Sequence, residues 1–407
     1  MVIRKRTLGV LLASFIVLWL NSGNFDYVSD RIPMVAKFGV VALWFLIACT
    51  SDRGFLNRYI RISFPIFVAL LLLIVSSFLG RTTYYEAYFM RFMYLAIIQA
   101  LFSYYFYGEP KRDVGFLLLV LLVDVSIVTI HTFIIVLQNP IVARAISTSL
   151  EMRTELIQNF IPDGVGGYGL CYQLAFIIPC VGYIFNERHH NTMVKILIYA
   201  AIVLSLFQFQ ITMALLLSVV FIFYFEIIRS NDGKWSIVFV KITALITLVL
   251  VALNFETVIG FITQYANDDL ADRLNELLSI RSPSVNDATD LLSRYQLYSK
   301  SISSFFSNPV WGKFGNGPFG DHSTFLDLLA SFGLLGLFGI CGICRPLTIL
   351  CKAFDKGSTE RLYVIWITIV FVFFSILNVS LWSDILLVCN LAIPLLFKVS
   401  SESLNRV

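Results

Sequence analysis

Long apolar stretches alternate with short polar segments along almost the whole chain. The stretches are continuous instead of alternating residue by residue, and many approach the roughly 20 residues that an α-helix needs to cross a bilayer. The pattern predicts about twelve membrane-spanning helices, with approximate ranges 7–21, 33–50, 62–79, 88–107, 114–136, 168–185, 193–208, 211–228, 236–254, 323–344, 362–378 and 384–398. Only Phe209 and Gln210 separate the seventh and eighth ranges, so these form either a tight hairpin or one bent element.

Composition agrees with a membrane location. Of the 407 residues, 58% are hydrophobic and 14% are charged, whereas ordinary globular chains have about 45–50% and about 25%. A water-soluble domain could not bury this much apolar surface, which excludes a soluble enzyme, a disordered chain and a nucleic-acid-binding domain. A β-barrel would show alternating segments of about ten residues, which are not found. The predicted class is an all-α polytopic membrane protein.

The basic residues predict the orientation. If the N-terminus is cytoplasmic, 19 of the 30 Lys and Arg residues fall on the cytoplasmic side, as the positive-inside rule requires. Arg4, Lys5 and Arg6 precede the first apolar stretch, and no small-residue cleavage site follows it. The first stretch is therefore interpreted as a retained helix and not as a signal peptide. Both termini are expected in the cytoplasm.

Two external segments are longer than simple connections, about 137–167 and about 255–322. They divide the chain into three parts: residues 1–254 carry the first nine helices and the 137–167 loop, residues 255–322 form a large external loop, and residues 323–407 carry the last three helices. The 255–322 loop contains helix-like stretches and is expected to form a helical cap. If the protein is an enzyme, its chemistry is expected in these loops and in the helix ends beneath them.

The densest group of polar residues and glycines lies between Leu291 and Gly336. Arg294 lies near the start of a predicted amphipathic helix. An Asn-Pro pair and several glycines predict a compact turn after it, and His322 lies just before the tenth predicted helix. Spacing alone leaves two interpretations open, because a lone histidine at a membrane interface is more often a satisfied polar group than a catalytic one. The glycines also have two interpretations: they allow the backbone to approach a bulky group closely, or they shape a turn.

This segment, roughly an eighth of the chain, resembles the C-terminal signature of the O-antigen polymerase and O-antigen ligase superfamily. The matching residues are Arg294, then Asn308-Pro309-x-x-Gly312, then His322-Ser323-x-x-Leu326, followed by Gly333 and Gly336. The resemblance implies a glycosyltransferase of the GT-C type in the bacterial inner membrane, with a periplasmic active site. It also implies that the donor and the acceptor are undecaprenyl-diphosphate-linked oligosaccharides, with a chain-length regulator protein as a further partner. The composition adds contact with membrane lipid and predicts no nucleic-acid partner.

Three functions compete at this stage. Ligases more often have His-Asn where this chain has His322-Ser323, which favours the polymerase branch. The alternatives are an O-antigen ligase that transfers glycan to lipid A-core, and a non-enzymatic polysaccharide carrier such as a flippase. Transporters commonly contain internal repeats, and no such repeat is found in this sequence.

The resemblance also suggests roles for individual residues. His322 is expected to position or deprotonate the attacking hydroxyl, since the ordinary pKa of histidine lies near neutrality. Arg294 and Arg153 are expected to clamp the diphosphate, because a guanidinium offers phosphate oxygens a fixed fork of donors. The expected substrate-binding residues are Arg281, Lys300, Arg91, Tyr298 and Asp321.

A second motif is weaker. Arg153 and Gly164 form an Arg-x10-Gly arrangement, which some polymerases show in the corresponding loop. Neither Arg294 nor Arg281 is followed by a glycine at this spacing, so the paired version of the motif is incomplete.

Two further sets of polar residues lie apart from this segment. Asp124 and His131 lie seven residues apart in the fifth range, so they share a helix face and could form either a proton relay or interhelical hydrogen bonds. Asp26 and Asp30 in the first external loop are too few to hold a hard cation. The sequence therefore predicts no metal and no cofactor. The seven cysteines lie in or beside apolar stretches, so a disulfide framework is not expected.

Overall fold

A computed structural model describes residues 5–21, 31–80, 82–108, 111–138, 164–187, 192–209, 211–228, 290–314, 319–320 and 322–401. This part of the chain contains helices and no strands. Eight of its helices are long and apolar enough to cross a membrane, and two shorter apolar helices accompany them. The protein is therefore an all-α polytopic membrane protein. The predicted helix at 236–254 and most of the predicted cap at 255–322 lie outside the described residues.

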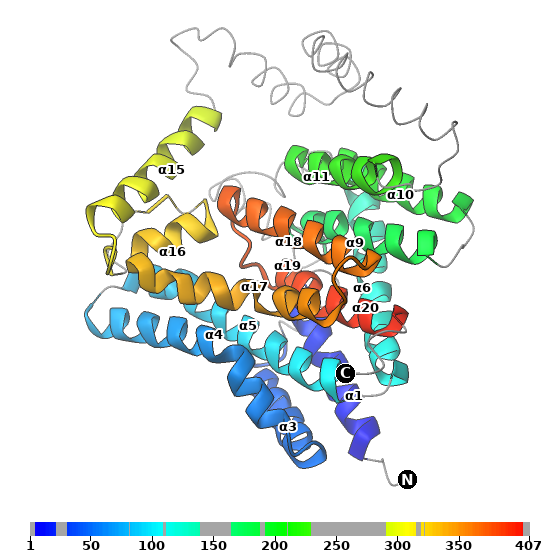
Figure 1. The fold of residues 1–407 in the computed structure, drawn as a ribbon, viewed down its shortest axis with the longest axis horizontal. Helices are drawn as coiled ribbons and strands as arrows, with labels where there is room; N and C mark the ends of the chain where they lie inside the picture. Colours follow the sequence, from blue (N-terminus) through cyan, green and yellow to red (C-terminus); the bar gives the residue numbers. More distant parts are fainter. Residues whose placement is uncertain are drawn as a thin grey trace, which may run out of the picture.

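The first five predicted ranges each correspond to one helix. These are α1 (Lys5–Leu20), α3 (Met34–Ser51), α4 (Phe55–Phe78), α5 (Thr82–Tyr107) and α6 (Lys111–Gln138) (Figure 1). α4 begins at Phe55, seven residues before its predicted range. The prediction began late because the first turns of the helix carry Arg58 and Arg61 and are less apolar than the rest. Hydropathy marks the part of a helix that fits the bilayer, while the hydrogen-bonded helix continues beyond it.

The middle of the chain forms α9 (Tyr168–Glu187), α10 (Thr192–Gln208) and α11 (Thr212–Ile222), which is extended by a π-helical turn (Phe223–Ile228). α10 and α11 pack against each other and are separated by three residues. The structure thus decides between the two interpretations of these ranges in favour of a tight hairpin.

The C-terminal part begins with α15 (Asp290–Ser307). The tenth predicted range is a broken helix: α16 (Thr324–Phe332), a 3₁₀ turn (Gly333–Leu335) and α17 (Gly336–Ala353). It is followed by α18 (Thr359–Leu377) and by a last span made of α19 (Ser383–Leu387), a π-helical turn (Val388–Ala392) and α20 (Ile393–Ser400).

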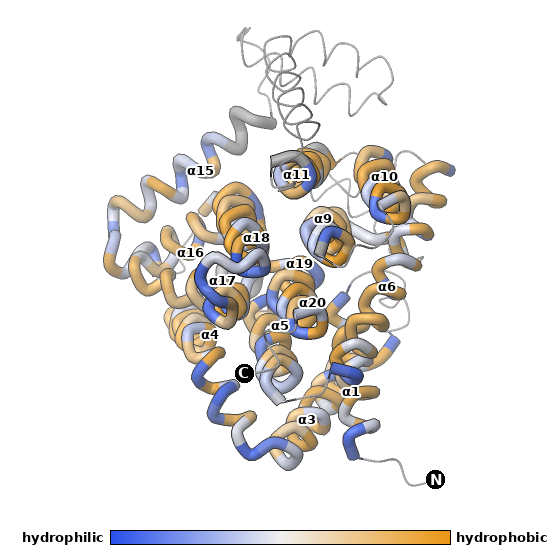
Figure 2. The backbone as a smooth tube through the Cα atoms, turned by 45° about the vertical axis from the view of Figure 1, so that its right-hand side comes forward, coloured by the Kyte–Doolittle hydropathy of each residue, from blue (hydrophilic) through white to orange (hydrophobic). Residues whose placement is uncertain are grey.

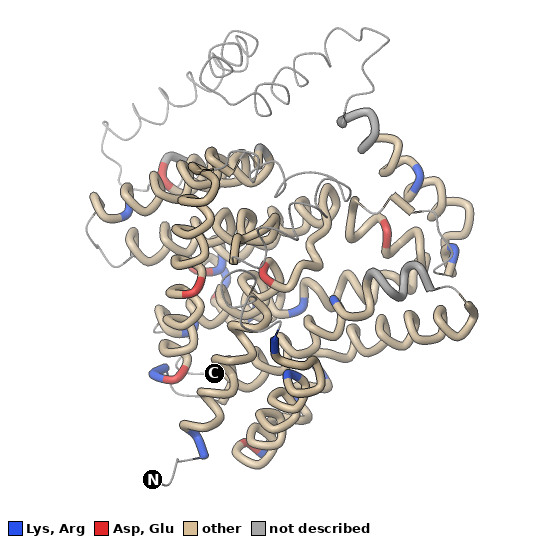
Figure 3. The backbone as a smooth tube through the Cα atoms, turned by 180° about the vertical axis from the view of Figure 1, so that it is seen from behind, with Lys and Arg blue, Asp and Glu red and all other residues tan. Residues whose placement is uncertain are grey.

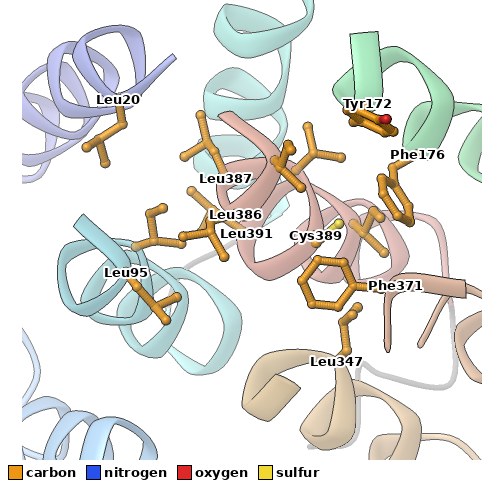
Figure 4. Close-up of a cluster of buried hydrophobic side chains, with 14 of the residues drawn as sticks. Leu20, Leu95, Tyr172, Phe176, Leu347, Phe371, Leu386, Leu387, Cys389 and Leu391 are labelled. Carbon is orange, nitrogen blue, oxygen red and sulfur yellow. The ribbon is translucent and has the colours of Figure 1, made fainter. Parts of the chain in front are cut away.

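The core lies where α5, α9, α17, α18 and the last span meet. Figure 4 shows Leu95, Phe176, Leu347 and Phe371 around the last span, which carries Leu386 and Leu391. The outward faces of the helices are apolar as well (Figure 2), and on α4 the side chains of Phe64, Leu71 and Phe78 are exposed. Apolar residues on both faces are typical of helices that pack together inside a bilayer.

The helix ends form two sets. At one end, Arg6 pairs with Asp113, and Lys111 Nζ donates to Ser401 O at 3.3 Å. We call this the basic end, because it carries most of the described Lys and Arg residues (Figure 3): Lys5, Arg6, Arg53, Arg58, Arg61, Lys111, Arg112, Lys195, Arg345, Lys352, Lys356, Arg361 and Lys398. At the other end, the motif end, α15 and the start of α16 lie beside the ends of α4 and α18, and the described Lys and Arg side chains include Arg91, Lys300 and Lys313.

Candidate functional site

The motif glycines join the turn after α15 to the break between α16 and α17. Leu334 N donates to Pro309 O at 2.8 Å. Gly312 and Gly333 both adopt left-handed conformations, with φ of 61° and 58°, which only glycine adopts at little cost. A Cβ atom on Gly333 would lie 2.5 Å from Pro309 O. The chain can make this backbone-to-backbone contact only where side chains are absent, and the contact accounts for the break in the helix.

A buried carboxylate joins α15 to the start of α16. Ser301 Oγ donates to Asp327 Oδ1 at 2.5 Å, and Ser323 N donates to Asp327 Oδ2 at 3.2 Å. Gly320 N in turn donates to Ser301 Oγ at 3.0 Å. Because Asp327 and Ser301 are buried, these bonds replace the water that a carboxylate would otherwise require. They hold α15 and the segment before α16 in one arrangement.

His322 is held at the start of α16 with its side chain exposed. The next residue, Ser323, is the N-cap of α16, and its Oγ accepts a hydrogen bond from Leu326 N at 3.1 Å. Such a cap satisfies one of the free N–H groups of the first helical turn. The cap and the Asp327 carboxylate therefore fix the backbone beside His322, which is an exposed residue.

The connection between α18 and α19 gathers side chains from several helices. Tyr298 of α15 donates its hydroxyl proton to Leu377 O at 2.6 Å. Tyr168 at the start of α9 donates to Asn378 Oδ1 at 2.9 Å, and Thr324 N of α16 donates to Asn378 O at 3.2 Å. Segments that lie far apart in the sequence therefore meet at one point of the motif end.

Arg91 of α5 reaches the same connection. Its guanidinium carbon lies 4.7 Å from the centre of the Trp382 ring and 5.2 Å from that of Tyr88. A guanidinium over an aromatic ring is held by cation–π attraction, and its N–H groups lie in its own plane, the direction from which phosphate oxygens bind. We call Arg91, Tyr168, Tyr298, His322 and Asn378 the mouth cluster.

The structure thus brings two predicted site residues, Tyr298 and Arg91, to a single connection, and a third, His322, lies two residues before Thr324, which bonds to the same connection. Lys300 is exposed and lies on the opposite side of α15 from Tyr298, because two residues correspond to about 200° around a helix. Position 294 lies in the first turns of α15, four residues before Tyr298 and on the same face. The remaining predicted residues, Arg153, Arg281 and Asp321, lie outside the described residues, as do Asp26 and Asp30.

A second polar group lies inside the bundle and includes residues that the sequence analysis did not single out. Asn21 Nδ2 donates to Asp124 Oδ2 at 2.6 Å, and Gln173 Nε2 donates to Asn21 Oδ1 at 2.6 Å. Asp384 is also buried, and its carboxylate packs against Gly169 at the start of α9. The only signal for these residues in the sequence is their isolated position at or near the ends of apolar stretches.

Asp124 and His131 have separate partners. Asp124 is bonded to Asn21, the residue directly after α1, and His131 Nδ1 lies 3.4 Å from Gly164 O, four residues before the start of α9. Asp124 thus bonds to the end of another helix, as in one of the two interpretations of this pair, whereas His131 contacts the segment that precedes α9. Gly164 of the Arg-x10-Gly arrangement has a left-handed φ of 77°.

Within the described ranges, no group of three or more His, Cys, Asp or Glu residues is arranged to hold a metal ion. An apolar groove of ≈ 350 Å³ lies between α6, α9 and the last span. Its lining includes Leu118, Ile177 and Leu396 and none of the predicted site residues.

The fold and its buried polar groups define an all-α polytopic membrane protein with a cluster of hydrogen-bonding and cationic side chains at one end. No protein-family model matches the sequence, and no curated protein matches it either. The functional conclusion therefore depends on the motif and on the geometry of the mouth cluster.

Proposed function

We propose that the protein is a glycosyltransferase that joins lipid-linked oligosaccharide repeat units, an O-antigen or polysaccharide polymerase. The observation that carries this proposal is the position of His322. It is exposed at the start of α16, on a backbone held by Ser323 and Asp327, and two residues before Thr324, which bonds to the connection that Tyr298 and Arg91 contact. A transfer of this kind needs a proton acceptor and a cation that binds the diphosphate.

In the proposed reaction, His322 takes the proton of a sugar hydroxyl on the acceptor. The hydroxyl oxygen forms a bond to the anomeric carbon of the donor, while the bond from that carbon to the diphosphate oxygen breaks. The lipid diphosphate leaves with the electron pair, and the imidazolium returns its proton to water. Arg91 and Arg294 stabilise the charge that develops on the diphosphate, since a guanidinium stays charged and offers a fork of donors.

The proposed site is periplasmic. The basic end is assigned to the cytoplasm by the positive-inside rule, which places both termini there and the mouth cluster on the opposite face of the bacterial inner membrane. The proposal includes the full set of about twelve helices in a GT-C-like arrangement, the 255–322 cap and the external arginines Arg153 and Arg281. Undecaprenyl-diphosphate-linked oligosaccharide serves as donor and acceptor, without a metal or other cofactor.

The test is His322→Ala, expressed in a host strain that lacks the native chain. A positioned acid–base group contributes about 10²–10⁴ in rate, so the ladder of long lipopolysaccharide chains should collapse to core carrying a single repeat unit. The control is Ser303→Ala: its hydroxyl bonds to Lys300 O within α15, and the ladder should stay normal. Both variants must reach the parent's protein level and protease resistance.

The other outcomes are distinct. Bare core without any repeat, seen on loss of the chain, would indicate a ligase instead of a polymerase. Repeat units that accumulate on the cytoplasmic side would indicate a carrier. A normal ladder from well-expressed His322→Ala would overturn the proposed role of His322.

A further inference from the structure

The surface of α15 divides into three arcs, because successive residues of an α-helix are turned by about 100°. One arc faces the protein and includes Ser301, which bonds to Asp327. The second is polar and exposed: Gln296, Lys300, Ser303 and Ser307. The third is apolar and exposed: Tyr295, Ile302 and Phe306 lie in one line at spacings of seven and four, and Tyr295 and Phe306 are 69% and 72% exposed.

The apolar arc continues into the turn that follows α15. Val310 and Trp311 are exposed there, Trp311 by 61%. A contiguous group of large exposed apolar side chains on a protein surface marks a contact with another apolar surface. The arc and the turn together form what we call the α15 strip: Tyr295, Ile302, Phe306, Val310 and Trp311.

The α15 strip is continuous with the lipid-facing surface of the helix bundle. Ser76 Oγ of α4 donates to Phe314 O at 3.2 Å, so the turn lies beside the end of α4, where Phe78 is 86% exposed. The bond from Leu334 N to Pro309 O places the same turn beside the start of α17, where Leu334 is exposed. Figures 1 and 2 show α15 at the margin of the molecule, next to α16.

We propose that α15 is an interfacial helix whose apolar strip lies in the outer layer of the bilayer. A helix with one apolar and one polar exposed face lies in the plane of the interface. Tyr295 and Trp311 are the residue types that favour this level, and Lys300 on the polar arc lies at the level of the lipid phosphates. The partner of the strip is the bilayer that already surrounds α4 and α17.

The contact of the α15 strip with lipid sets the depth of the motif segment in the membrane. α15 is bonded to α16 through Ser301 and Asp327, so anchoring α15 at the interface also holds His322 at a constant height. For the proposed transferase this height matches the substrate, because a lipid diphosphate lies at the membrane surface. This consequence rests on the proposed function, whereas the lipid contact itself does not.

The test measures the depth of labels on the two exposed arcs. Nitroxide labels are attached to Ile302→Cys and Phe306→Cys on the apolar arc, and to Ser303→Cys and Ser307→Cys on the polar arc of the same helix. The parent is the full chain with the exposed Cys341 replaced by alanine, and its residual labelling is subtracted. The protein is placed in nanodiscs of phosphatidylethanolamine and phosphatidylglycerol. Power-saturation EPR then compares access of oxygen, which concentrates in lipid, with access of a water-soluble nickel chelate.

We expect the Ile302→Cys and Phe306→Cys labels to be accessible to oxygen and protected from nickel, and the two polar-arc labels to show the reverse. Equal nickel access on both arcs would place the strip in water and overturn the proposal. Low access to both reagents on the apolar arc would mean that protein covers the strip, which would overturn it as well.

Fluorescence provides a second measurement without cysteines. Lipids brominated in their acyl chains should quench the tryptophan emission of the parent. This quenching should be smaller in Trp311→Phe, because the variant lacks the tryptophan that lies in the lipid. An unquenched Trp311 signal would contradict the proposal. Neither measurement depends on activity, so failure of the lipid contact and failure of the polymerase proposal are distinguishable.

Discussion

Gly312 and Gly333 contact each other backbone to backbone at the motif end of the bundle. A Cβ atom on Gly312 would lie 2.5 Å from Gly333 N, and both residues have a φ close to +60°. The two residues lie on either side of His322 in the sequence. Their contact therefore closes the loop that carries His322, and its removal should affect the whole segment.

Gly312→Ala should destabilise the protein by more than the left-handed conformation alone costs, about 1–2 kcal/mol. The added Cβ would also run into the backbone of Gly333. The control is Gly80→Ala, because Gly80 has a φ of 72° but no atom within 4 Å of its Cβ position. Thermal unfolding in detergent measures both variants, and equal shifts would mean that the close contact contributes nothing.

The bond between Ser301 and Asp327 should be measurable as a coupling energy. Hydrogen bonds to charged groups contribute about 1.5–3 kcal/mol, and this one is buried. A double-mutant cycle with Ser301→Ala and Asp327→Asn should give a coupling in this range. Additive effects of the two substitutions on the free energy of unfolding would show that the bond does not hold α15 to α16.

Gly169→Ala should disturb the start of α9, because a Cβ at this position would fall on the Asp384 carboxylate. Gly167→Ala is the matched control two residues earlier, where the Cβ position is open. We expect a lower unfolding temperature and less folded protein for Gly169→Ala only. A well-folded Gly169→Ala protein would mean that Asp384 moves away at little cost.

Arg91→Lys should lose most of the proposed polymerase activity although it keeps the charge. Lysine is a point charge, and it cannot reproduce a guanidinium that lies over the Trp382 ring and presents a fork of donors. Arg361→Lys at the basic end should leave activity unchanged. The lipopolysaccharide ladder gives the readout, and equal activity of Arg91→Lys and the parent would remove Arg91 from the site.

Reporter fusions should confirm the orientation. A fusion after Lys356, in the connection between α17 and α18, should report a cytoplasmic location, and one near Asn286 a periplasmic location. The basis is the concentration of Lys and Arg at the basic end. Reversed signals would place the mouth cluster in the cytoplasm and exclude periplasmic chemistry.

The positions of the helices could be predicted from the sequence, whereas the residues that contact one another between helices could not. The sixth predicted range, 168–185, corresponds to α9 at Tyr168–Glu187, because the thickness of a bilayer sets the length of an apolar stretch. The break at Gly333 was not predicted, because the glycine matched a motif inside an apolar range and its partner Pro309 comes from another segment. Asn21, Gln173 and Asp384 were missed because a single polar residue in an apolar stretch carries no information about its partner.

The sequence by itself determined the class of the protein, the positions of its described helices and the residues of the motif. These features depend on local composition and length, which a bilayer converts directly into helices. Only the tertiary structure decided that Asp124 bonds to Asn21, that Gly312 meets Gly333, and that Arg91 and Tyr298 reach the connection near His322. Such contacts join segments far apart in the chain, and they depend on which faces of the helices pack together, a choice that side-chain shape and hydrogen bonding make in three dimensions.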